Sequence, residues 1–451
     1  MFESLKRVHV IGAGGIGVSA AAKWLLRAGV KVTASDVVDS VLLVALRERG
    51  AVTFVGHAAE QVPTDADMIL YSPAVPETNV ERVRAAELGI VQRSYPEFLG
   101  DRSRELSTVA VSGTNGKSTT TAMLGCILVE AGLDPTVVVG TLVPGFEDGN
   151  LRVGASDRFV VEACEYRGAM LELAPKMVVL TNIEEDHLDY FRDLNHIVET
   201  FQAYVDGVPC VVMNADDPVM QRLRLGRYLT YGFAESADVR ASDRRVGAGE
   251  QSVAVAWRGV DCGRITLVVP GLFNVSNALA ATTAALELGV PFDVCVAALA
   301  KFTGCWRRFE RVGTIGRVEV ISDYGHHPTA IRGTLEAARE FFSGRRIVLC
   351  FQPHQHARTI ELRDGFVEAL AGADILVLPE IYRVSGRTEA DEISSRDLVA
   401  DIERMHPGKE VFYAADLAKA TQMVRSLVLS GDVLIVQGAG DVDDVARNLV
   451  R

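Results

Sequence analysis

Two glycine-rich segments, residues 11–17 and 113–119, narrow the range of folds open to this chain. Each follows a short apolar run and precedes a stretch with the apolar spacing of an amphipathic helix. Each therefore predicts a strand, a tight turn and a helix. Such a segment opens a βαβ unit, in which helices join parallel strands. We therefore predict an α/β fold.

At 451 residues the chain is too long for a single core, and the apolar runs group into three successive α/β units. We expect a Rossmann-like domain over 1–104, a central P-loop-type ATPase domain over 105–311 and a Rossmann-like domain over 312–451. The polar segment 100–106 is predicted to be a linker. Short alternating segments over 235–270 predict a small antiparallel side sheet in the central domain.

The charge balance bears on the class of partner. The 46 basic and 59 acidic residues give a net charge of −13, which disfavours nucleic acid or a membrane surface as the main partner. Seven scattered cysteines without a CxxC pair are typical of a reducing compartment, and no run of eighteen apolar residues occurs. We expect a cytoplasmic enzyme, a monomer or weak homodimer, that holds anionic substrates at local positive sites.

The second glycine segment has the features of a phosphate-binding loop. Its backbone N–H groups and the following helix N-terminus can surround an anion, while Lys117 reaches terminal phosphates and Ser118 offers its hydroxyl to Mg²⁺. Val111 stands where the general nucleotide-loop pattern has its first glycine. A tight turn with a solvated lysine is the alternative, but the strand and helix context favours an ATP site.

This loop consists of Gly113, Thr114, Asn115, Gly116, Lys117, Ser118 and Thr119. It resembles the ATP loop of Mur ligases and folylpolyglutamate synthases. The resemblance extends over almost the whole chain. It implies ATP and Mg²⁺ as cofactors. The strand ending at Glu162 resembles the one whose glutamate binds magnesium, and the segment around His187 resembles the one whose histidine binds a second magnesium. Ser118, Glu162 and His187 are the expected metal ligands.

Two further segments resemble ATP contacts of the family. Residues 272–281 resemble the start of the adenine-binding helix, with Asn274 and Asn277 as the expected contacts and Phe273 in place of a histidine. A helix-capping role for Asn274 is an open alternative. Residues 305–310 resemble the hinge that sends an arginine, here Arg308, to the phosphates. Asp323 completes the expected ATP site.

The first glycine segment alone is a dinucleotide fingerprint, which keeps an NAD(P)-dependent oxidoreductase as an alternative. The family resemblance instead implies that it holds the UDP part of UDP-N-acetylmuramate. The expected contacts are Gly12, Gly14, Gly15, Ile16, Gly17, Asp36, Ser72 and Arg93.

Residues 322–329 bear on the second substrate. They are most similar to the family members that join L-alanine to UDP-N-acetylmuramate, whereas the related recycling ligases, which attach a tripeptide, usually show Phe-Ala in place of Tyr324 and Gly325. The recycling reaction remains the alternative. Residues 197–204 offer no lysine where the later Mur ligases place a carbamylated one. The expected amino-acid contacts are Tyr324, His326, His354 and Arg358.

The segment 353–359 departs from the family pattern, because Gln355 replaces an arginine and His356 an aromatic residue. The resemblance implies an acyl-phosphate mechanism in which ATP activates a carboxylate for attack by an amine. The expected catalytic residues are Lys117, Glu162, His187, Arg308 and His327. The general base is left open among His326, His327 and His354. These intact residues disfavour a catalytically idle ATP-binding regulator.

Overall fold

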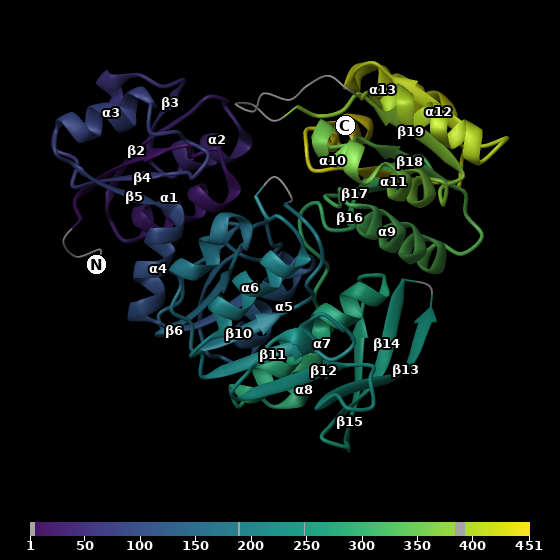
Figure 1. The fold of residues 1–451 in the computed structure, drawn as a ribbon, viewed down its shortest axis with the longest axis horizontal. Helices are drawn as coiled ribbons and strands as arrows, with labels where there is room; N and C mark the ends of the chain where they lie inside the picture. Colours follow the sequence, from purple (N-terminus) through teal and green to yellow (C-terminus); the bar gives the residue numbers. More distant parts are fainter. Residues whose placement is uncertain (1–4, 188–189, 248, 384–392) are drawn as a thin grey trace. The chain divides into compact units, whose positions relative to one another are not determined.

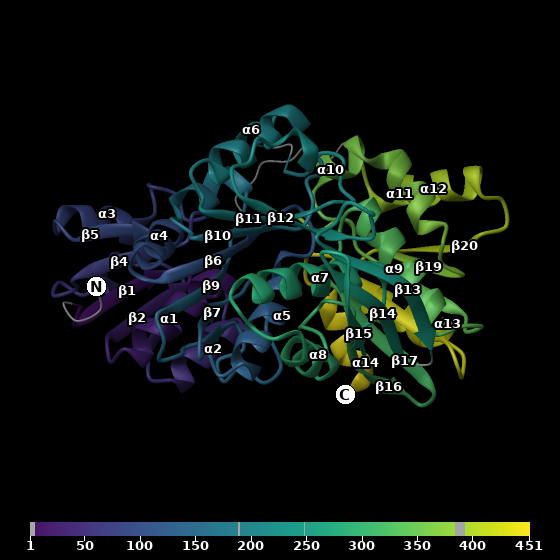
Figure 2. The same cartoon turned by 90° about the horizontal axis from the view of Figure 1, so that it is seen from below.

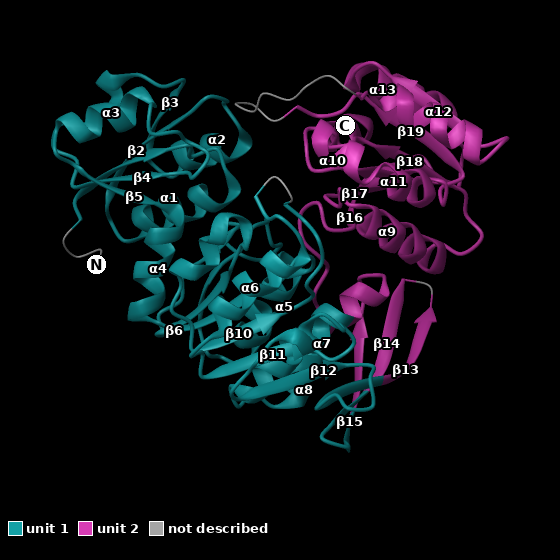
Figure 3. Ribbon diagram, viewed as in Figure 1, with its two compact units in different colours: residues 1–241, 255–262, 276–299 teal, residues 242–254, 263–275, 300–451 magenta. Residues whose placement is uncertain are grey.

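The structure is a computed structural model that describes residues 5–187, 190–247, 249–383 and 393–451. Its strands form sheets of five, ten and six strands (Figure 1), which confirms the predicted three-domain α/β fold class. The chain divides into two compact units (Figure 3). Unit 1 contains residues 1–241, 255–262 and 276–299, and unit 2 contains residues 242–254, 263–275 and 300–451.

The first sheet is parallel, with the strand order β3-β2-β1-β4-β5. Its elements are β1 (Arg7–Ile11), α1 (Ile16–Arg27), β2 (Lys31–Asp36), α2 (Val41–Glu48), β3 (Val52–Val55), η2 (Ala59–Gln61), β4 (Met68–Tyr71), α3 (Val80–Glu87) and β5 (Val91–Ser94). Figure 2 shows α3 on one face and α1 and α2 on the other. The chain therefore leaves β1 and β4 in opposite directions, and their carboxyl ends form a topological switch point, where such sheets bind ligands.

The linker predicted over 100–106 is wrong, because residues 100–105 belong to helix α4 (Tyr95–Glu105) and Leu106 is its C-cap. Ser94 and Glu97 form a capping box at its start and a proline lies in its first turn, both of which favour helix initiation. A Cβ at Gly100 would lie 2.5 Å from the carbonyl oxygen of Glu172, so the helix packs closely on the central domain. Of the polar residues of the segment, Arg104 and Glu105 are exposed, whereas Arg102 and Ser103 are buried.

The central sheet has the order β15-β14-β13-β12-β11-β10-β6-β9-β7-β8. Its elements are β6 (Ser107–Ser112), α5 (Lys117–Glu130), β7 (Thr136–Val138), β8 (Leu151–Arg152), β9 (Arg158–Glu162), η3 (Tyr166–Glu172), β10 (Met177–Leu180), α6 (Leu194–Val205), β11 (Cys210–Asn214), η4 (Met220–Arg222), β12 (Tyr228–Gly232), β13 (Val239–Gly247), β14 (Glu250–Trp257), β15 (Val260–Leu267), α7 (Leu272–Glu287) and α8 (Phe292–Ala300). Strand β6 pairs in parallel with β9 and β10, so the carboxyl ends of these three strands meet at one edge.

The side strands of the central domain are antiparallel at β14 and β15. Only Arg258 and Gly259 connect them, and both have positive φ angles of 47° and 80°. Two such residues form the type I′ turn of a tight hairpin, which joins antiparallel strands only. The predicted side sheet is therefore present.

The third sheet has the order β16-β17-β21-β18-β19-β20 and is parallel except for β16. Its elements are β16 (Glu310–Ile315), β17 (Val318–Asp323), α9 (Pro328–Phe341), β18 (Ile347–Phe351), α10 (His356–Glu361), α11 (Arg363–Leu370), β19 (Ile375–Pro379), α12 (Ser395–Met405), β20 (Glu410–Ala414), α13 (Leu417–Leu427), β21 (Val433–Gln437) and α14 (Asp443–Val450). Strands β18, β19 and β21 are buried throughout, as expected where helices cover both faces of a parallel sheet.

The part of the chain that the structure describes contains no helix long and apolar enough to cross a membrane. All seven cysteines are free thiols. Burial raises the pKa of Cys295 and Cys350 to about 12, so these two thiols stay protonated and are poor nucleophiles.

A buried carboxylate, Glu81, anchors α3 to the first sheet. Its Oε2 accepts a hydrogen bond from the Ser35 hydroxyl at 2.6 Å, and it lies 3.0 Å from His57 Nδ1 and 3.6 Å from His9 Nε2. Burial alone would raise the pKa of Glu81, but the nearby His9 ring and the hydrogen bond from Ser35 outweigh burial and lower it. Glu81 is therefore charged and stabilises the domain in that form.

We expect Glu81→Gln to lower the free energy of unfolding at neutral pH by about 2 kcal/mol, the range for hydrogen bonds to a charged group. The pKa of Glu81 in the folded protein is lower than that of an ordinary carboxyl group. Its contribution to the free energy of unfolding is therefore fully present above the ordinary carboxyl pKa, and it is lost as the pH falls through the lowered pKa. Urea unfolding across this acid range measures it. Exposed Glu60 on η2 is the matched control, and an equal loss for Glu60→Gln or a pH-independent difference would contradict the assignment.

Candidate active site

The glycine loop between β6 and α5 is tightly packed against neighbouring segments of unit 1. Gly113 has φ +130°, and a Cβ there would lie 2.1 Å from Thr181 Oγ1. Gly116 has φ +86°, and a Cβ there would lie 2.3 Å from Asn277 Oδ1. Both positions therefore require glycine for conformation and for space. The sharp turn directs the loop backbone to the N-terminus of α5.

Backbone and side-chain hydrogen bonds fix the loop to the segment that follows β10. The Thr114 N–H donates to the carbonyl oxygen of Asn182 at 2.9 Å, and the Asn115 N–H donates to Asn182 Oδ1 at 2.8 Å. The Thr181 hydroxyl donates to the carbonyl oxygen of Asn115 at 2.5 Å. The loop is thus held in place before any ligand binds, which is the preorganisation that phosphate recognition needs.

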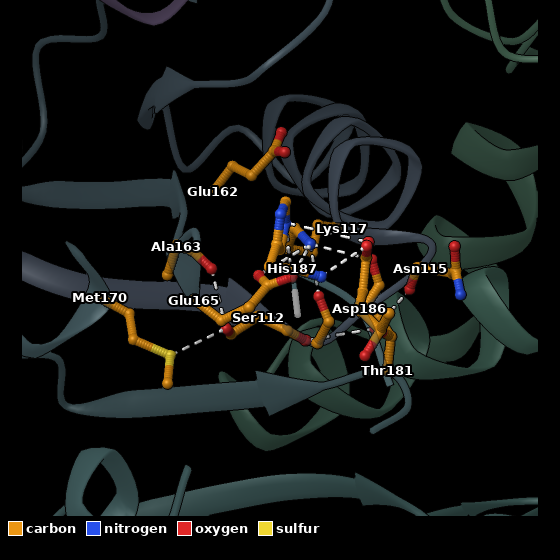
Figure 4. Close-up of polar contacts among 12 residues, drawn as sticks. Ser112, Asn115, Lys117, Glu162, Ala163, Glu165, Met170, Thr181, Asp186 and His187 are labelled. Carbon is orange, nitrogen blue, oxygen red and sulfur yellow. Dashed lines mark hydrogen bonds and ion pairs between the residues drawn. The ribbon is translucent and has the colours of Figure 1, made fainter. Parts of the chain in front are cut away.

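Lys117 lies within the loop rather than in solvent. Its Nζ donates to the carbonyl oxygens of Gly113 and Thr114 at 2.5 and 3.0 Å and to Glu165 Oε1 at 3.0 Å, as Figure 4 shows. Burial disfavours its charge, but the Glu165 carboxylate outweighs burial and raises the pKa of Lys117. A permanent positive charge therefore sits inside the loop.

Glu162 and Ser118 bring two oxygen donors together at the start of α5. The Ser118 hydroxyl donates to Glu162 Oε1 at 3.0 Å, and the Gly140 N–H donates to Glu162 Oε2 at 2.6 Å. Among the described residues no group of three or more His, Cys, Asp or Glu side chains is arranged to hold a metal ion. A hydroxyl and one carboxylate fit Mg²⁺, which takes few protein ligands beside phosphate oxygens and water.

His187 lies beside the Glu165 carboxylate that pairs with Lys117. It has a positive φ of 55°, and its Nε2 is 3.8 Å from Glu165 Oε1 and 3.9 Å from Asp186 Oδ2. Its ring packs on Tyr166 with the centroids 4.8 Å apart. A non-glycine residue held in this conformation is strained, and such residues gather at functional sites.

Glu165 connects the two parts of this cluster, and sequence reasoning did not single it out. Its side chain is 3% exposed and contacts both Lys117 and His187 (Figure 4). One signal in the sequence could have identified it: Glu165 is a second acidic residue, three positions after the strand-end Glu162. Of the predicted metal ligands, Ser118 and Glu162 touch, whereas His187 is joined to the loop through Glu165.

The remaining predicted ATP contacts are divided between the units. Thr119 is buried in the first turn of α5, and Asn277 Oδ1 accepts a hydrogen bond from the Thr120 hydroxyl at 3.2 Å in unit 1. Asn274 belongs to unit 2, and its Nδ2 donates to the carbonyl oxygen of Pro270 at 2.7 Å. Asn274 lies inside the first turn of α7, so it ties down the preceding chain and is not the N-cap residue.

The first glycine turn closes tightly around Asp36 and Ser72. A Cβ at Gly12 would lie 2.8 Å from Ser72 Cβ, and one at Gly14 would lie 2.9 Å from the Asp36 carboxylate. The Gly14 N–H donates to Asp36 Oδ2 at 2.8 Å. The turn residues, Asp36 and Ser72 therefore meet at the switch point, with Gly15 and Ile16 at the start of α1.

Two predicted residues of the first domain have other surroundings. Gly17 packs against the ring of Tyr95, since a Cβ there would lie 2.7 Å from it. Arg93 is at the end of β5, where its guanidinium lies 3.6 Å from the Asp101 carboxylate and 4.0 Å from that of Glu97. Arg93 therefore faces α4 rather than the glycine turn.

In unit 2, Arg308 lies over the ring of Tyr324, 4.8 Å from its centroid. Its neighbour Arg307 is buried and donates to the backbone carbonyls of Gly438 and Gly440. Arg307 is thus tied to the backbone that follows β21, and Arg308 stacks on Tyr324. The guanidinium is oriented by the aromatic ring, which favours stacking of this kind.

Asp323 is predicted to be an ATP contact, but its carboxylate accepts hydrogen bonds from other residues of unit 2. It accepts from the backbone N–H groups of Phe309 and Gly325, both at 2.8 Å, and from Gln437 Nε2 at 3.1 Å. These bonds hold the segments before β16 and after β17 together. The structure therefore gives Asp323 a role in ordering the segment that carries Arg308.

The predicted amino-acid contacts gather at the carboxyl ends of β17 and β18. The His326 and His354 rings lie 5.8 Å apart, and His354 stacks on Tyr382 with centroids 5.3 Å apart. Arg358 Nη1 is 3.5 Å from His354 Nδ1, and Tyr324 packs edge-on against His326. Four predicted residues are thus brought together, and Tyr382 joins them without having been predicted.

His327 and the two substituted positions have local structural roles. The His327 Nδ1 accepts a hydrogen bond from the Thr329 N–H at 3.3 Å and so caps α9. Gln355 has a positive φ of 71° and precedes α10, while His356 is buried as its first residue. Because the lone pair on His327 Nδ1 accepts this capping hydrogen bond, Nδ1 cannot also act as a base.

Comparisons with known proteins agree over the whole chain. Family models match residues 7–105 (Mur ligase family, catalytic domain), 111–285 (Mur ligase middle domain) and 307–440 (Mur ligase, glutamate ligase domain). A UDP-N-acetylmuramate–L-alanine ligase of Geotalea uraniireducens is 38% identical over 461 residues, covering 100% of this chain and 99% of the relative.

Solved structures resemble the chain to different degrees. The UDP-N-acetylmuramate–alanine ligase of Thermotoga maritima superposes with a TM-score of 0.87 at 30% identity, covering 99% of this chain and 98% of that one. A murein peptide ligase of Psychrobacter arcticus gives a TM-score of 0.72 at 22% identity, with 98% of each chain covered. The second likeness concerns the fold alone.

Proposed function

Because this chain belongs to the Mur ligase family, we propose that it joins L-alanine to UDP-N-acetylmuramate in a reaction that consumes ATP. It is an acid–amino-acid ligase that forms ADP and acts in peptidoglycan precursor synthesis. The 38% identity to an alanine ligase along the entire chain is the observation that carries this function. An NAD(P)-dependent oxidoreductase does not account for the second glycine loop.

The chemistry follows from the need to give the carboxylate a leaving group. The lactyl carboxylate oxygen of the sugar attacks the γ-phosphorus of ATP, and the bond to the β–γ bridging oxygen breaks to release ADP. The neutral amine of alanine then attacks the acyl carbon. Phosphate leaves with the former carboxylate oxygen, and the amine loses a proton to a base.

The glycine loop is the proposed phosphate site for this transfer. The N–H groups in the first turn of α5 and Lys117 are proposed to face developing negative charge on the phosphoryl oxygens, with Arg308 as the second positive group. Ser118 and Glu162 would hold Mg²⁺, and the family resemblance adds His187 for a second ion. When bound, Mg²⁺ neutralises charge on the phosphate oxygens. Asn274 and Asn277 are the proposed adenine contacts.

The cluster at the ends of β17 and β18 is the proposed amino-acid site. Arg358 is the proposed partner of the alanine carboxylate through a charge-assisted pair, with Tyr324 as a further proposed contact. His326 and His354 are the proposed sources of the base, since the Nδ1 of His327 is used to cap α9. The first glycine turn, with Asp36 and Ser72, is the proposed UDP site.

The protein is proposed to work in the cytoplasm, as a monomer or weak homodimer, without a nucleic-acid or membrane partner. The domain limits proposed for it are 1–104 for the sugar-nucleotide domain, 105–311 for the ATP domain and 312–451 for the amino-acid domain. Each of these three domains contains one of the three sheets. The exception is strand β16 of the third sheet, which crosses the limit between residues 311 and 312.

Phosphate release with ATP and UDP-N-acetylmuramate, assayed against single amino acids and the murein tripeptide, tests the function. L-Alanine is expected to exceed glycine in kcat/KM by at least about tenfold, since a methyl group in an apolar pocket contributes about 1–3 kcal/mol. The tripeptide should turn over hardly at all. Dominance of the tripeptide product would assign the recycling reaction instead, and turnover of NADH without phosphate release would assign the oxidoreductase.

A further inference from the structure

Asn150 is a buried side chain between α1 and the central sheet, outside the sites described so far. Its Nδ2 donates to the carbonyl oxygen of Ile16 at 2.5 Å and to Ser19 Oγ at 2.9 Å. Its side chain is fully buried, as is that of Ser19. Ile16 and Ser19 form the first turn of α1, which begins directly after the first glycine turn.

Lys23 fixes the orientation of the Asn150 amide. Its Nζ donates to Asn150 Oδ1 at 2.6 Å and to the carbonyl oxygen of Asp148 at 2.8 Å. Burial lowers the pKa of Lys23 to about 8, as does nearby Arg49, while Asp148 opposes the change. An ammonium group only donates, so Oδ1 must face Lys23 and the NH₂ group must face Ile16. The amide has one orientation that satisfies both sides.

The backbone of the same segment reaches the expected metal carboxylate. The Val139 N–H donates to the carbonyl oxygen of Asn150 at 3.1 Å. The next residue, Gly140, donates its N–H to Glu162 Oε2 at 2.6 Å, and a Cβ at Gly140 would lie 2.8 Å from both carboxylate oxygens. A continuous series of hydrogen bonds and adjacent residues thus connects the first turn of α1 with Glu162.

We propose that Asn150 is a positioning residue that couples the sugar-nucleotide turn to the Glu162 and Ser118 pair through Val139 and Gly140. The proposal rests on the proposed function, which places the UDP group at the first turn and Mg²⁺ with ATP at the second. A diphosphate bound at the start of α1 restrains Ile16, and Asn150 passes this restraint to Gly140 and the Glu162 carboxylate. The two ligands therefore bind cooperatively, and linkage makes the effect equal in both directions.

The test is equilibrium binding of UDP-N-acetylmuramate to the full-length protein by calorimetry. Each titration is made without and with saturating Mg²⁺ and a non-hydrolysable ATP analogue, and the ratio of the two dissociation constants measures the coupling. We expect about a fivefold ratio for the wild type, the lower end for coupled sites. Asn150→Ala is expected to bring the ratio to about one, so that the sites bind independently.

Asn150→Asp is the second variant, because it keeps the size and the contact with Lys23 but loses the NH₂ donor to Ile16. The matched control is Asn79→Ala, which removes a side chain that caps α3 in the same domain. Asn79→Ala should lower the melting temperature and leave the ratio near fivefold. A purely structural role for Asn150 predicts the same pattern as Asn79.

The outcomes separate this proposal from the proposed function. A wild-type ratio of one, or an unchanged ratio in both Asn150 variants, overturns the coupling and leaves the ligase function intact. Failure of the wild type to bind UDP-N-acetylmuramate under any condition overturns both. A ratio of about five that falls to one in Asn150→Asp and persists in Asn79→Ala supports the positioning role.

Discussion

Lys117→Ala is expected to lower kcat/KM by about a thousandfold, the upper end for losing one preorganised group that stabilises transition-state charge. The ammonium is held inside the glycine loop by two backbone carbonyls and Glu165, so no neighbouring side chain takes its place. The initial rate of phosphate release over a range of ATP concentrations, with the other two substrates saturating, measures the loss. Turnover above about a tenth of the wild-type rate, a difference of only 1.4 kcal/mol, would contradict the ATP site.

The same substitution also affects stability, because Lys117 pairs with a buried carboxylate. Glu165 is 3% exposed, and removing Lys117 leaves its carboxylate buried without that partner. Breaking a buried pair costs about 3–5 kcal/mol. The double variant Lys117→Met with Glu165→Gln removes both charges and should recover much of the stability but none of the activity. Recovery of activity in the double variant would show that the single variant had simply unfolded.

Regular elements built from continuous apolar runs were predictable residue by residue. Strands β4 and β10 begin and end where their apolar runs do, since a strand covered by helices is built from apolar residues. Strand β21 continues one residue beyond its apolar run, to the buried Gln437. Helix α4 was missed because its residues after Gly100 are polar and its capping box lies upstream of the segment judged to be a linker.

The glycine loops were predictable as turns, but their partners were not. Local sequence shows that Gly113 and Gly116 permit a sharp turn, whereas Thr181 and Asn277 approach them from 68 and 161 positions away. The same holds for Asp323, since two of the groups that donate to its carboxylate, on Phe309 and Gln437, lie 14 and 114 positions away. Contacts between distant segments are set by the packing of the sheet, which a single sequence does not display.

Glu165 links Lys117 to His187, and removing its charge should therefore change catalysis as well as stability. Glu165→Gln keeps the size of the side chain while it removes the carboxylate that raises the pKa of Lys117. We expect kcat/KM to fall by about a hundredfold, the size of effect produced by small misplacements of a catalytic group. Phosphate release is measured with each substrate varied in turn while the other two are saturating. These measurements separate the loss into changes in kcat and in KM.

The pH profile distinguishes this electrostatic role from a purely structural one. With Glu165 neutral, burial still opposes the Lys117 charge while the main group that offsets burial is lost, so the pKa of Lys117 falls. At low pH the lysine is protonated in both proteins, and the deficit of the variant should widen as the pH rises through its lowered pKa. The alkaline limb of kcat/KM therefore moves to lower pH. Glu172→Gln, an exposed change on η3, should leave the profile in place, and parallel profiles for Glu165→Gln and the wild type would contradict the pairing.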